Sequence, residues 1–448
     1  MNKLDTALIT ASLSEAGYDF VDEFNQADVV LMNTCSVRKH AEDKVFSNLG
    51  IIKSLKENKQ SVILGIIGCM AQRLGGELLE NKTVDFVCGP SQIPQIVDLI
   101  NKAIHGDRST AVLQDIRTGT SDNESARLED FESVFDRHDK NIPGQAFVRA
   151  MRGCNNFCSY CIVPYVRGPE ISRSPQFVVE QVKKLADEGV KMVTLLGQTV
   201  NSYNYKSGDK TYSLADLLDM VSDIAGIEWI RFVTNYPQEK YYDDILEVMA
   251  GNSKICNYLH MCAQSGSNRI LKAMNRRYTA EQYLDLVARA KEGVKGIAVA
   301  GDFIIGFPGE TEEDFQQTVE LVKQARYRNA FIFKYSPRPG TKSEIKMIDD
   351  VPAEVKKRRN IELLAVQEQI SSELSKEFEG RTVRVLVEGL SKKPHLNKAE
   401  NLNMPQLVGR TTEDWIVVFN GHPELAGNFA RVKITKSSPL TLFGHLVE

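Results

Sequence analysis

Residues 152–161 read Arg152-Gly153-Cys154-Asn155-Asn156-Phe157-Cys158-Ser159-Tyr160-Cys161, which places three thiols at the spacing C-x3-C-x2-C. The number is informative, because a closed structural zinc site takes four ligands and ferredoxin-type iron–sulfur clusters are held by four thiolates. Three clustered cysteines therefore predict an iron–sulfur cluster with one iron left open, and an open iron can bind a substrate. Two alternatives remain: a zinc site completed by a distant fourth ligand, and buried free thiols.

Length and composition indicate an ordinary globular protein with more than one domain. At about 150 residues per domain, 448 residues predict two to four domains. The chain is 42% hydrophobic and 25% charged, and it has neither a run of about 18 apolar residues nor a signal-peptide pattern. We therefore expect neither membrane insertion nor secretion, and a cytoplasmic location. Because the cytoplasm keeps thiols reduced, the eight cysteines are expected to be metal ligands rather than disulfides.

Charge is distributed unevenly along the chain. The formal net charge of −4 argues against a protein that coats nucleic acid by bulk charge. Residues 381–448 carry nine Lys and Arg against six Asp and Glu, a balance of +3, which leaves −7 for the remainder. A local basic face at this end would suit nucleic acid, and an ordinary solvated small domain is the alternative.

Residues 1–104 alternate between helix and strand. A helix is expected over residues 5–18, and buried strands over residues 27–33, 62–67 and 84–87. This pattern predicts a parallel α/β domain, in which the functional site lies beyond the carboxyl ends of the strands. Cys35 and Cys69 follow two of these strands, so they are expected to meet in space.

A polar and charged stretch over residues 105–142 separates this domain from the next. It is predicted to be a linker or mobile cover, with residues 118–124 the least structured part. Pro143-Gly144 ends the stretch.

Residues 145–335 repeat one unit six times: a short apolar strand, a loop rich in Gly or polar residues, and an amphipathic helix. Six such units predict a partial (β/α)6 barrel. The first strand runs directly into the three-cysteine loop, which puts the loop at the carboxyl end of the barrel, where such folds carry out their chemistry. The predicted strands are residues 146–151, 192–196, 229–233, 258–261, 298–305 and 330–334.

Polar residues that follow the later strands are expected to face this site. We expect Gln198, Gln264 and Ser265 to contact a cofactor or substrate, because a polar side chain at the mouth of a barrel has few structural duties. A turn or helix cap is the alternative for each. Helix starts are predicted at Ser213 and at Thr279, and Thr311 is predicted to be a helix cap.

Four further residues with metal-binding or reactive side chains have no predicted chemical role. His260 is more often a satisfied core histidine than a ligand, and Cys262 lies beside it near the fourth strand. Cys88 is predicted to be a buried thiol, and Cys256 has no predicted partner.

Near the end of the chain the spacing of apolar residues changes from a helical pattern to strict alternation. One long helix is expected over residues 353–377, and from Arg381 apolar residues alternate with polar ones, as at Val383, Val385 and Val387. Several short strands with turns between them predict a small β-barrel.

The stretch AMRGCNNFCSYCIVPYVRG (residues 150–168) resembles the cluster-binding loop of radical S-adenosylmethionine (SAM) enzymes. The resemblance implies that Cys154, Cys158 and Cys161 hold three irons of a 4Fe-4S cluster and that SAM chelates the fourth. Tyr160 stands where this family has an aromatic residue before the third cysteine. It further implies that reductive cleavage of SAM yields a 5'-deoxyadenosyl radical, so the cofactor supplies the hard chemistry.

Residues 33–38 (NTCSVR) and 68–73 (GCMAQR) resemble two of the three cysteine motifs of the methylthiotransferase N-terminal domain. In that family three cysteines hold an auxiliary 4Fe-4S cluster, which implies Cys35 and Cys69 as ligands. The first motif is normally Tyr-Gly-Cys-Gln-Met-Asn, and this chain begins with Met1-Asn2, as though inside it. We interpret this as a truncated or mis-assigned start; otherwise the auxiliary cluster has two protein ligands.

Near the end of the chain, residues 409–411 (GRT) and 442–444 (LFG) resemble the TRAM domain, an RNA-binding module. Basic residues there would contact phosphates. The resemblance to the methylthiotransferases thus covers nearly the whole chain. It predicts an N-terminal domain at 1–104, a linker at 105–142, a radical SAM domain at 143–379 and a TRAM domain at 380–448.

Residues 33–38, 161–165 and 196–203 are similar to the MiaB-type branch, while Thr199 and residues 233–237 depart from its usual motifs. The branch implies methylthiolation of N6-dimethylallyladenosine beside the anticodon of tRNA, with an electron donor such as flavodoxin or ferredoxin. One SAM would methylate a sulfide at the auxiliary cluster, and a second would remove hydrogen from carbon 2 of the base. The threonylcarbamoyladenosine branch, the ribosomal-protein aspartate branch and a non-catalytic, zinc-bearing RNA-binding protein are the alternatives.

Overall fold

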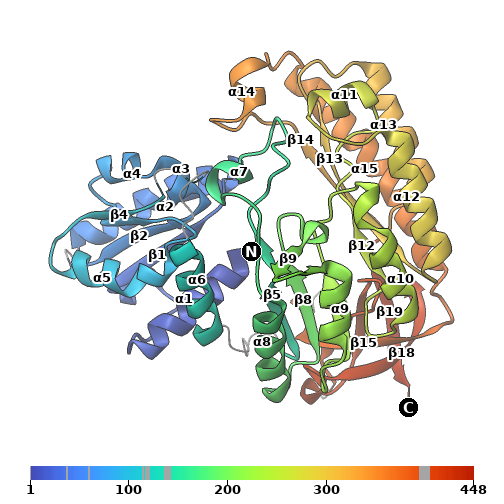
Figure 1. The fold of residues 1–448 in the computed structure, drawn as a ribbon, viewed down its shortest axis with the longest axis horizontal. Helices are drawn as coiled ribbons and strands as arrows, with labels where there is room; N and C mark the ends of the chain where they lie inside the picture. Colours follow the sequence, from blue (N-terminus) through green and yellow to red (C-terminus); the bar gives the residue numbers. More distant parts are fainter. Residues whose placement is uncertain are drawn as a thin grey trace. The chain divides into compact units, whose positions relative to one another are not determined.

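The structure is a computed structural model that describes residues 2–36, 39–58, 61–113, 116, 122–135, 143–392 and 404–447. The chain divides into two compact units, and Figure 1 shows the elements of both. The first comprises residues 1–137, 151–173 and 336–346, and the second comprises residues 138–150, 174–335 and 347–448. Each unit therefore combines segments that are distant in the sequence.

The first unit is built on a four-stranded parallel sheet in the order β1-β2-β3-β4. Every residue of β2 is buried, as expected for a central strand of a parallel sheet covered on both faces. The predicted α/β pattern is thus confirmed, with the third strand ending at Cys88. The strands are β1 (Val29–Thr34), β2 (Ile63–Gly68), β3 (Phe86–Cys88) and β4 (Ser109–Ala111).

The helices of the first unit differ from the sequence prediction at two places. Helix α1 begins at Asn2 rather than Asp5 and ends at Glu15, because Leu4 and Leu8 both belong to the buried face. The predicted linker over 105–142 contains β4 and α6 (Asp122–Phe135), while residues 118–121 lie outside the described residues. The other helices of the sheet are α2 (Lys39–Asn58), α3 (Cys69–Leu74), α4 (Glu77–Glu80) and α5 (Ile96–Ile104).

The three-cysteine loop belongs to this first unit. Its ends are joined by a short antiparallel pair, β6 (Met151–Arg152) with β7 (Ile171–Ser172). Within the loop α7 (Val163–Val166) follows the third cysteine, and the separate segment 336–346 adds α14 (Lys342–Lys346).

The second unit contains the six strands predicted for the partial barrel. They are β5 (Gln145–Arg149), β8 (Met192–Leu196), β11 (Trp229–Phe232), β12 (Tyr258–His260), β13 (Ala298–Ile305) and β14 (Asn329–Lys334). All their pairings are parallel, in the orders β11-β8-β5 and β12-β13-β14. Single bridges, Ile230 to Ile255 and Asn235 to Met261, join the two sheets.

Helices connect these strands, and one connection contains an unpredicted hairpin, β9 (Asn204–Ser207) with β10 (Lys210–Ser213). The helix starts predicted at Ser213, Thr279 and Thr311 are confirmed, each with a capping box. The connecting helices are α8 (Pro175–Asp187), α9 (Leu214–Ser222), α10 (Asp243–Gly251), α11 (Asn268–Ala273), α12 (Ala280–Gly293) and α13 (Glu312–Ala325). The long α15 (Ala353–Lys376) follows the last strand and packs against α13 and β14.

A closed barrel in the order β15-β16-β17-β19-β18 ends the second unit. The alternation predicted from the sequence is confirmed: Val385, Val387, Val432 and Ile434 are all buried in its core with Trp415. The strands are β15 (Thr382–Leu390), β16 (Gln406–Arg410), β17 (Ile416–Asn420), β18 (Phe429–Ser437) and β19 (Thr441–Val447).

The small barrel packs on the strand starts of the (β/α) barrel, within the same unit. Trp229, the first residue of β11, meets Phe429 edge to face at 4.7 Å, and Met192 and Leu386 complete the contact. Cys256, which had no predicted partner, is buried in this contact. Among the described residues, every helix is too short or too polar to span a bilayer.

Candidate functional site

Glycine sets the shape of the three-cysteine loop at its first cysteine. Gly153 has φ +73°, and a Cβ there would lie 1.7 Å from the carbonyl oxygen of Pro169. No other residue fits that approach without moving backbone. The next residue, Cys154, donates its backbone N–H to the Gly168 carbonyl at 3.1 Å, which closes the loop on itself.

The three predicted ligands lie on this closed loop, and none of them forms a disulfide. Cys154 and Cys158 are each 8% exposed and Cys161 is half-buried. The Cys161 N–H bonds to the Cys158 carbonyl at 2.9 Å, and the side-chain amide of Asn156 donates to Cys154 Sγ at 3.4 Å. Soft sulfur donors on irregular backbone, with an N–H aimed at one sulfur, fit an iron–sulfur cluster.

Contacts on both sides hold the loop within the first unit. The Glu170 carboxylate accepts the backbone N–H of Asn155 at 3.1 Å, and the side-chain oxygen of Asn155 accepts the backbone N–H of Glu170 at 3.2 Å. The Ser159 carbonyl accepts the N–H of Ser343 at 2.7 Å. Phe157, at φ +47°, meets Tyr165 edge to face at 6.2 Å. Tyr160 lies half-buried between the second and third cysteines.

Cys35 and Cys69 lie at one edge of the parallel sheet, as predicted. Strands β1 and β2 end in register, with Thr34 opposite Gly68. Cys35 directly follows Thr34, and Cys69 directly follows Gly68. Gly68 has φ +94°, and a Cβ there would lie 2.5 Å from the Thr34 carbonyl oxygen, so the two strand ends approach closely. Cys88 ends the neighbouring strand and is fully buried, as predicted, and burial raises the pKa of its thiol.

Arg167, six residues after Cys161, reaches the second of these cysteines. Its Nε donates to Cys69 Sγ at 3.2 Å, and its Nη2 donates to Asp5 of α1 at 2.7 Å. Burial raises the pKa of the Cys69 thiol, and the Arg167 guanidinium offsets this only in part. The loop that carries the three cysteines therefore also supplies a cation to the sulfur of Cys69.

At the carboxyl ends of β8 and β11, two buried side-chain oxygens lack hydrogen-bond partners among the described residues. They are Oε1 of Gln198, which follows β8, and Oδ1 of Asn235, which follows β11. A buried polar atom without a partner is costly, so two at the ends of neighbouring strands indicate a place for a polar ligand. Gln198 was predicted from the sequence and Asn235 was not.

Gln264 and Ser265 follow β12 and have defined places in the fold. Gln264 has φ +70°; its N–H donates to the Asp302 carbonyl at 2.7 Å and its carbonyl accepts Ile304 N–H at 3.0 Å. The Ser265 hydroxyl contacts Thr318 at 3.3 Å and accepts the N–H of Ser267 at 3.2 Å. Contact with a cofactor stays a prediction for both, and Ser265 has in addition a structural duty.

Sequence reasoning missed Arg167, Asp5, Asn235 and Asp302. Asp302 had a signal, because it is a charged residue inside the otherwise apolar strand β13. Arg167 and Asp5 lie in no local pattern that links them.

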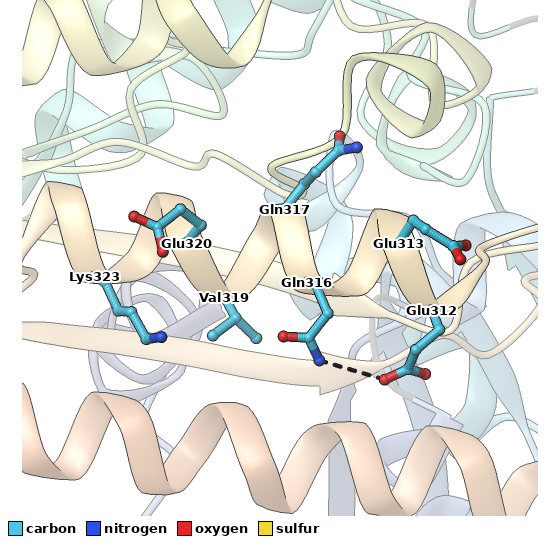
Figure 2. Close-up of a pocket in the computed structure, with 7 residues that line it drawn as sticks. All are labelled: Glu312, Glu313, Gln316, Gln317, Val319, Glu320 and Lys323. Atoms are coloured by element: carbon cyan, nitrogen blue, oxygen red, sulfur yellow. Dashed lines mark hydrogen bonds between the residues drawn. The ribbon is translucent and has the colours of Figure 1, made fainter.

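A shallow hollow on the outer face of α13 is not part of the site. Figure 2 shows seven lining residues that all belong to this one helix, with Glu312, Glu313 and Glu320 among them. Its acidic lining does not suit RNA phosphates.

Comparison with known proteins agrees with this arrangement. Three family models match the chain: the uncharacterized protein family UPF0004 over residues 1–89, the radical SAM superfamily over 148–322 and the TRAM domain over 376–447. A tRNA-2-methylthio-N(6)-dimethylallyladenosine synthase from Rhodopirellula baltica is 42% identical over 100% of this chain and 93% of its own length. The chain belongs to this family.

Other members of the family are similarly close. The synthase of Parabacteroides distasonis is 39% identical and that of Desulforamulus reducens is 41% identical, each over 100% of this chain and 93% of its own length. Among solved structures, the radical SAM methyltransferase TsrM from Kitasatospora setae has a TM-score of 0.55 at 16% identity, over 77% of this chain and 71% of that one. That likeness shows the radical SAM fold, and the superfamily implies a 4Fe-4S cluster and SAM.

Proposed function

We propose that this chain converts N6-dimethylallyladenosine beside the anticodon of tRNA to its 2-methylthio derivative. Identity of 39 to 42% to three synthases of that name, over the whole chain, carries the proposal. The position of Cys154, Cys158 and Cys161 on one closed loop, outside any disulfide, supports it, because this chemistry needs three thiolates and one open iron.

In this proposal the three loop cysteines hold a 4Fe-4S cluster that leaves one iron for SAM. When bound, the cluster and SAM supply one-electron chemistry at the substrate carbon. Tyr160, Gln198 and Gln264 are proposed to position SAM or the base; the orphaned oxygen of Gln198 supports this role. Ser265 is proposed to contribute only indirectly, by anchoring the chain segment in which it lies.

Cys35 and Cys69 are proposed to hold a second, auxiliary cluster. Their register at the ends of β1 and β2 supports this, as does the Arg167 N–H directed at Cys69 Sγ. Hydrogen bonds to cluster sulfurs make the potential of a cluster less negative. Arg167 would therefore favour the reduced form of the auxiliary cluster.

The substrate is proposed to be bound in part by the TRAM domain. The match over 376–447 and the exposed Arg431 of β18 support RNA binding there. We also propose the domain boundaries given above, an electron donor such as flavodoxin or ferredoxin, and a cytoplasmic location, where thiols stay reduced.

The test is mass spectrometry of tRNA nucleosides from a bacterial strain that lacks its own synthase and expresses this chain. The wild type should convert N6-dimethylallyladenosine to the 2-methylthio nucleoside, and Cys158→Ala should leave the precursor unconverted. Methylthiolation of threonylcarbamoyladenosine instead would assign the chain to the other tRNA branch. Purified, anaerobically reconstituted protein that holds zinc without iron would end the enzymatic interpretation.

A further inference from the structure

Three side chains with different metal-binding atoms converge in the second unit. They are His260 at the end of β12, Cys262 two residues later, and Asp302 in β13. One ligand atom from each lies within 4.8 Å of the other two. The parallel register of β12 and β13, with His260 opposite Ala300, brings these residues together.

The atoms approach in an unusual way. Asp302 Oδ2 lies 3.0 Å from Cys262 Sγ and 3.3 Å from His260 Nε2. Nε2 is buried and lies within ion-pair distance of the Asp302 carboxylate. A core histidine paired with this carboxylate, as the sequence predicted, is the alternative to a metal ligand. A buried ring nitrogen that lies near both a thiol and a carboxylate is placed as a metal ligand would be.

Partners fix the backbone of all three residues. Asn235 donates its N–H and its side-chain amide to the His260 carbonyl, each at 3.0 Å. Arg276 and Tyr278 donate to the Cys262 carbonyl at 2.7 and 3.1 Å. The Asp302 carbonyl accepts Gln264 N–H at 2.7 Å. A site whose ligands are held this firmly needs little reorganisation to bind an ion.

The donor atoms of the site also suit a metal. One nitrogen, one sulfur and one oxygen donor form the mixed set that borderline divalent metals prefer over Mg²⁺ or Ca²⁺.

We propose that His260, Cys262 and Asp302 bind one mononuclear transition-metal ion of the Zn²⁺ class. Ordinary Zn²⁺ bond lengths and a tetrahedral angle require separations of about 3.4 Å between nitrogen and oxygen and about 3.6 Å from each to sulfur. The observed nitrogen–oxygen separation of 3.3 Å and oxygen–sulfur separation of 3.0 Å are each within about an ångström of the required values. Three protein ligands leave a coordination position for water or a substrate atom, as in catalytic rather than structural zinc sites.

The proposal is independent of the proposed function, since none of these residues is a ligand of either proposed cluster. The competing explanation is a thiol–carboxylate–imidazole triad that holds no metal. A second competitor is Zn²⁺ that occupies the cluster cysteines in damaged protein.

The experiment uses the full chain with its clusters reconstituted anaerobically, equilibrated with buffered Zn²⁺ and freed of loose metal. Zinc and iron per chain are measured for the wild type, Cys262→Ser, Asp302→Asn and the control Cys256→Ser, whose thiol is buried in a different contact. Zinc K-edge absorption then reports the ligands, since Zn–S bonds of about 2.3 Å and Zn–N or Zn–O bonds of about 2.0–2.2 Å are resolved.

We expect one zinc per chain in the wild type and in Cys256→Ser, with a single sulfur ligand. Asp302→Asn and Cys262→Ser should bind zinc at least about tenfold more weakly, with iron content unchanged. No zinc in the wild type would establish the metal-free triad. Zinc with three or four sulfur ligands, retained in both variants, would place it in the cluster sites. Either result overturns the proposal.

Discussion

The guanidinium of Arg167 donates a hydrogen bond from Nε to Sγ of Cys69 at 3.2 Å. Arg167 lies on the three-cysteine loop, whereas Cys69 begins the helix after β2, 98 residues earlier. Ile162 and Val166 pack directly on Cys69 as well. The two sets of proposed cluster ligands are therefore joined within one compact unit, through one cation and a small apolar contact.

The buried pair of Arg167 and Asp5 gives the first prediction. Both side chains are at most 6% exposed, so Arg167→Gln should leave the Asp5 charge buried and cost about 3–5 kcal/mol of unfolding free energy. The double variant Arg167→Gln with Asp5→Asn leaves no buried charge and should recover part of this stability. Urea unfolding of the protein without clusters measures both. A double variant no more stable than the single one would contradict the charge explanation.

Gly153→Ala should disrupt the cysteine loop. Its new Cβ would lie 1.7 Å from the Pro169 oxygen, so the backbone beside Cys154 must move. We expect a clear decrease in bound iron per chain after reconstitution. Gly189→Ala is the matched control: its φ is +91° and nothing lies within 4 Å of the new Cβ, so it should cost only about 1–2 kcal/mol of stability and keep its iron. Equal iron in both variants would show that the approach to Pro169 does not set the loop.

Asp414 joins the small barrel to the (β/α) barrel. Its carboxylate lies 2.7 Å from Arg231, 3.0 Å from Arg410 and 3.8 Å from Arg328. Because Arg231 and Arg328 are buried, Asp414→Asn should cost about 3–5 kcal/mol. Thermal unfolding should show the decrease, while Glu413→Gln next to it should unfold near the wild-type temperature. Unchanged stability in Asp414→Asn would mean that the arginines find other partners.

Glu310 predicts a pH dependence of stability. Its Oε2 accepts the Gly306 N–H at 2.7 Å and pairs with Arg359 at 2.9 Å, yet burial raises the pKa of the carboxyl from 4.5 to about 7. The folded protein then holds a proton that the unfolded chain has released, so this group's stabilisation is complete below pH 4.5 and falls as pH rises to about 7, by at most about 1.4 kcal/mol per pH unit.

Glu310→Gln lacks this proton. Its stability relative to the wild type should therefore increase between pH 4.5 and 7 and stay constant above. Chemical unfolding at several pH values measures the difference. If the stability of Glu310→Gln relative to the wild type instead decreased as pH rises, Arg359 would be lowering the pKa of Glu310.

The basic residues on the outward face of β18 give a prediction about the salt dependence of RNA binding. Arg431 and Lys433 alternate with the buried Val432 and Ile434, so they point away from the core. Replacing both by Ala should weaken tRNA binding and reduce the slope of log K against log salt by about 1 for each phosphate that is no longer neutralised. Filter binding over a salt series measures the slope. Weaker binding with an unchanged slope would exclude phosphate binding by these residues.

Much of the fold could be predicted from the sequence because buried parallel strands are continuous apolar runs. The strands over 192–196 and 298–305 agree with the prediction to the residue. Helix α6 was missed because its segment is mostly polar and buries few side chains, among them Leu128 and Phe131. The hairpin of β9 and β10 was missed because its residues are exposed or half-buried and show no alternation.

The site was predictable only where local spacing carries the chemistry. Cysteine spacing led to the prediction of Cys154, Cys158 and Cys161, and strand ends led to the prediction of Cys35, Cys69 and Gln198; all six remain candidates. The pairing of Arg167 with Asp5 spans 162 residues, and the convergence of His260 and Asp302 depends on strand register. Tertiary contacts of this kind leave no periodic signal.

The contact of Trp229 with Phe429 has a consequence for substrate size. It seats the small barrel at the starts of β8 and β11, whereas Gln198 and Asn235 lie past their far ends. A five-residue strand such as β8 is about 17 Å long. A free nucleoside is shorter than that, so a substrate that engages both ends at once must be a polymer.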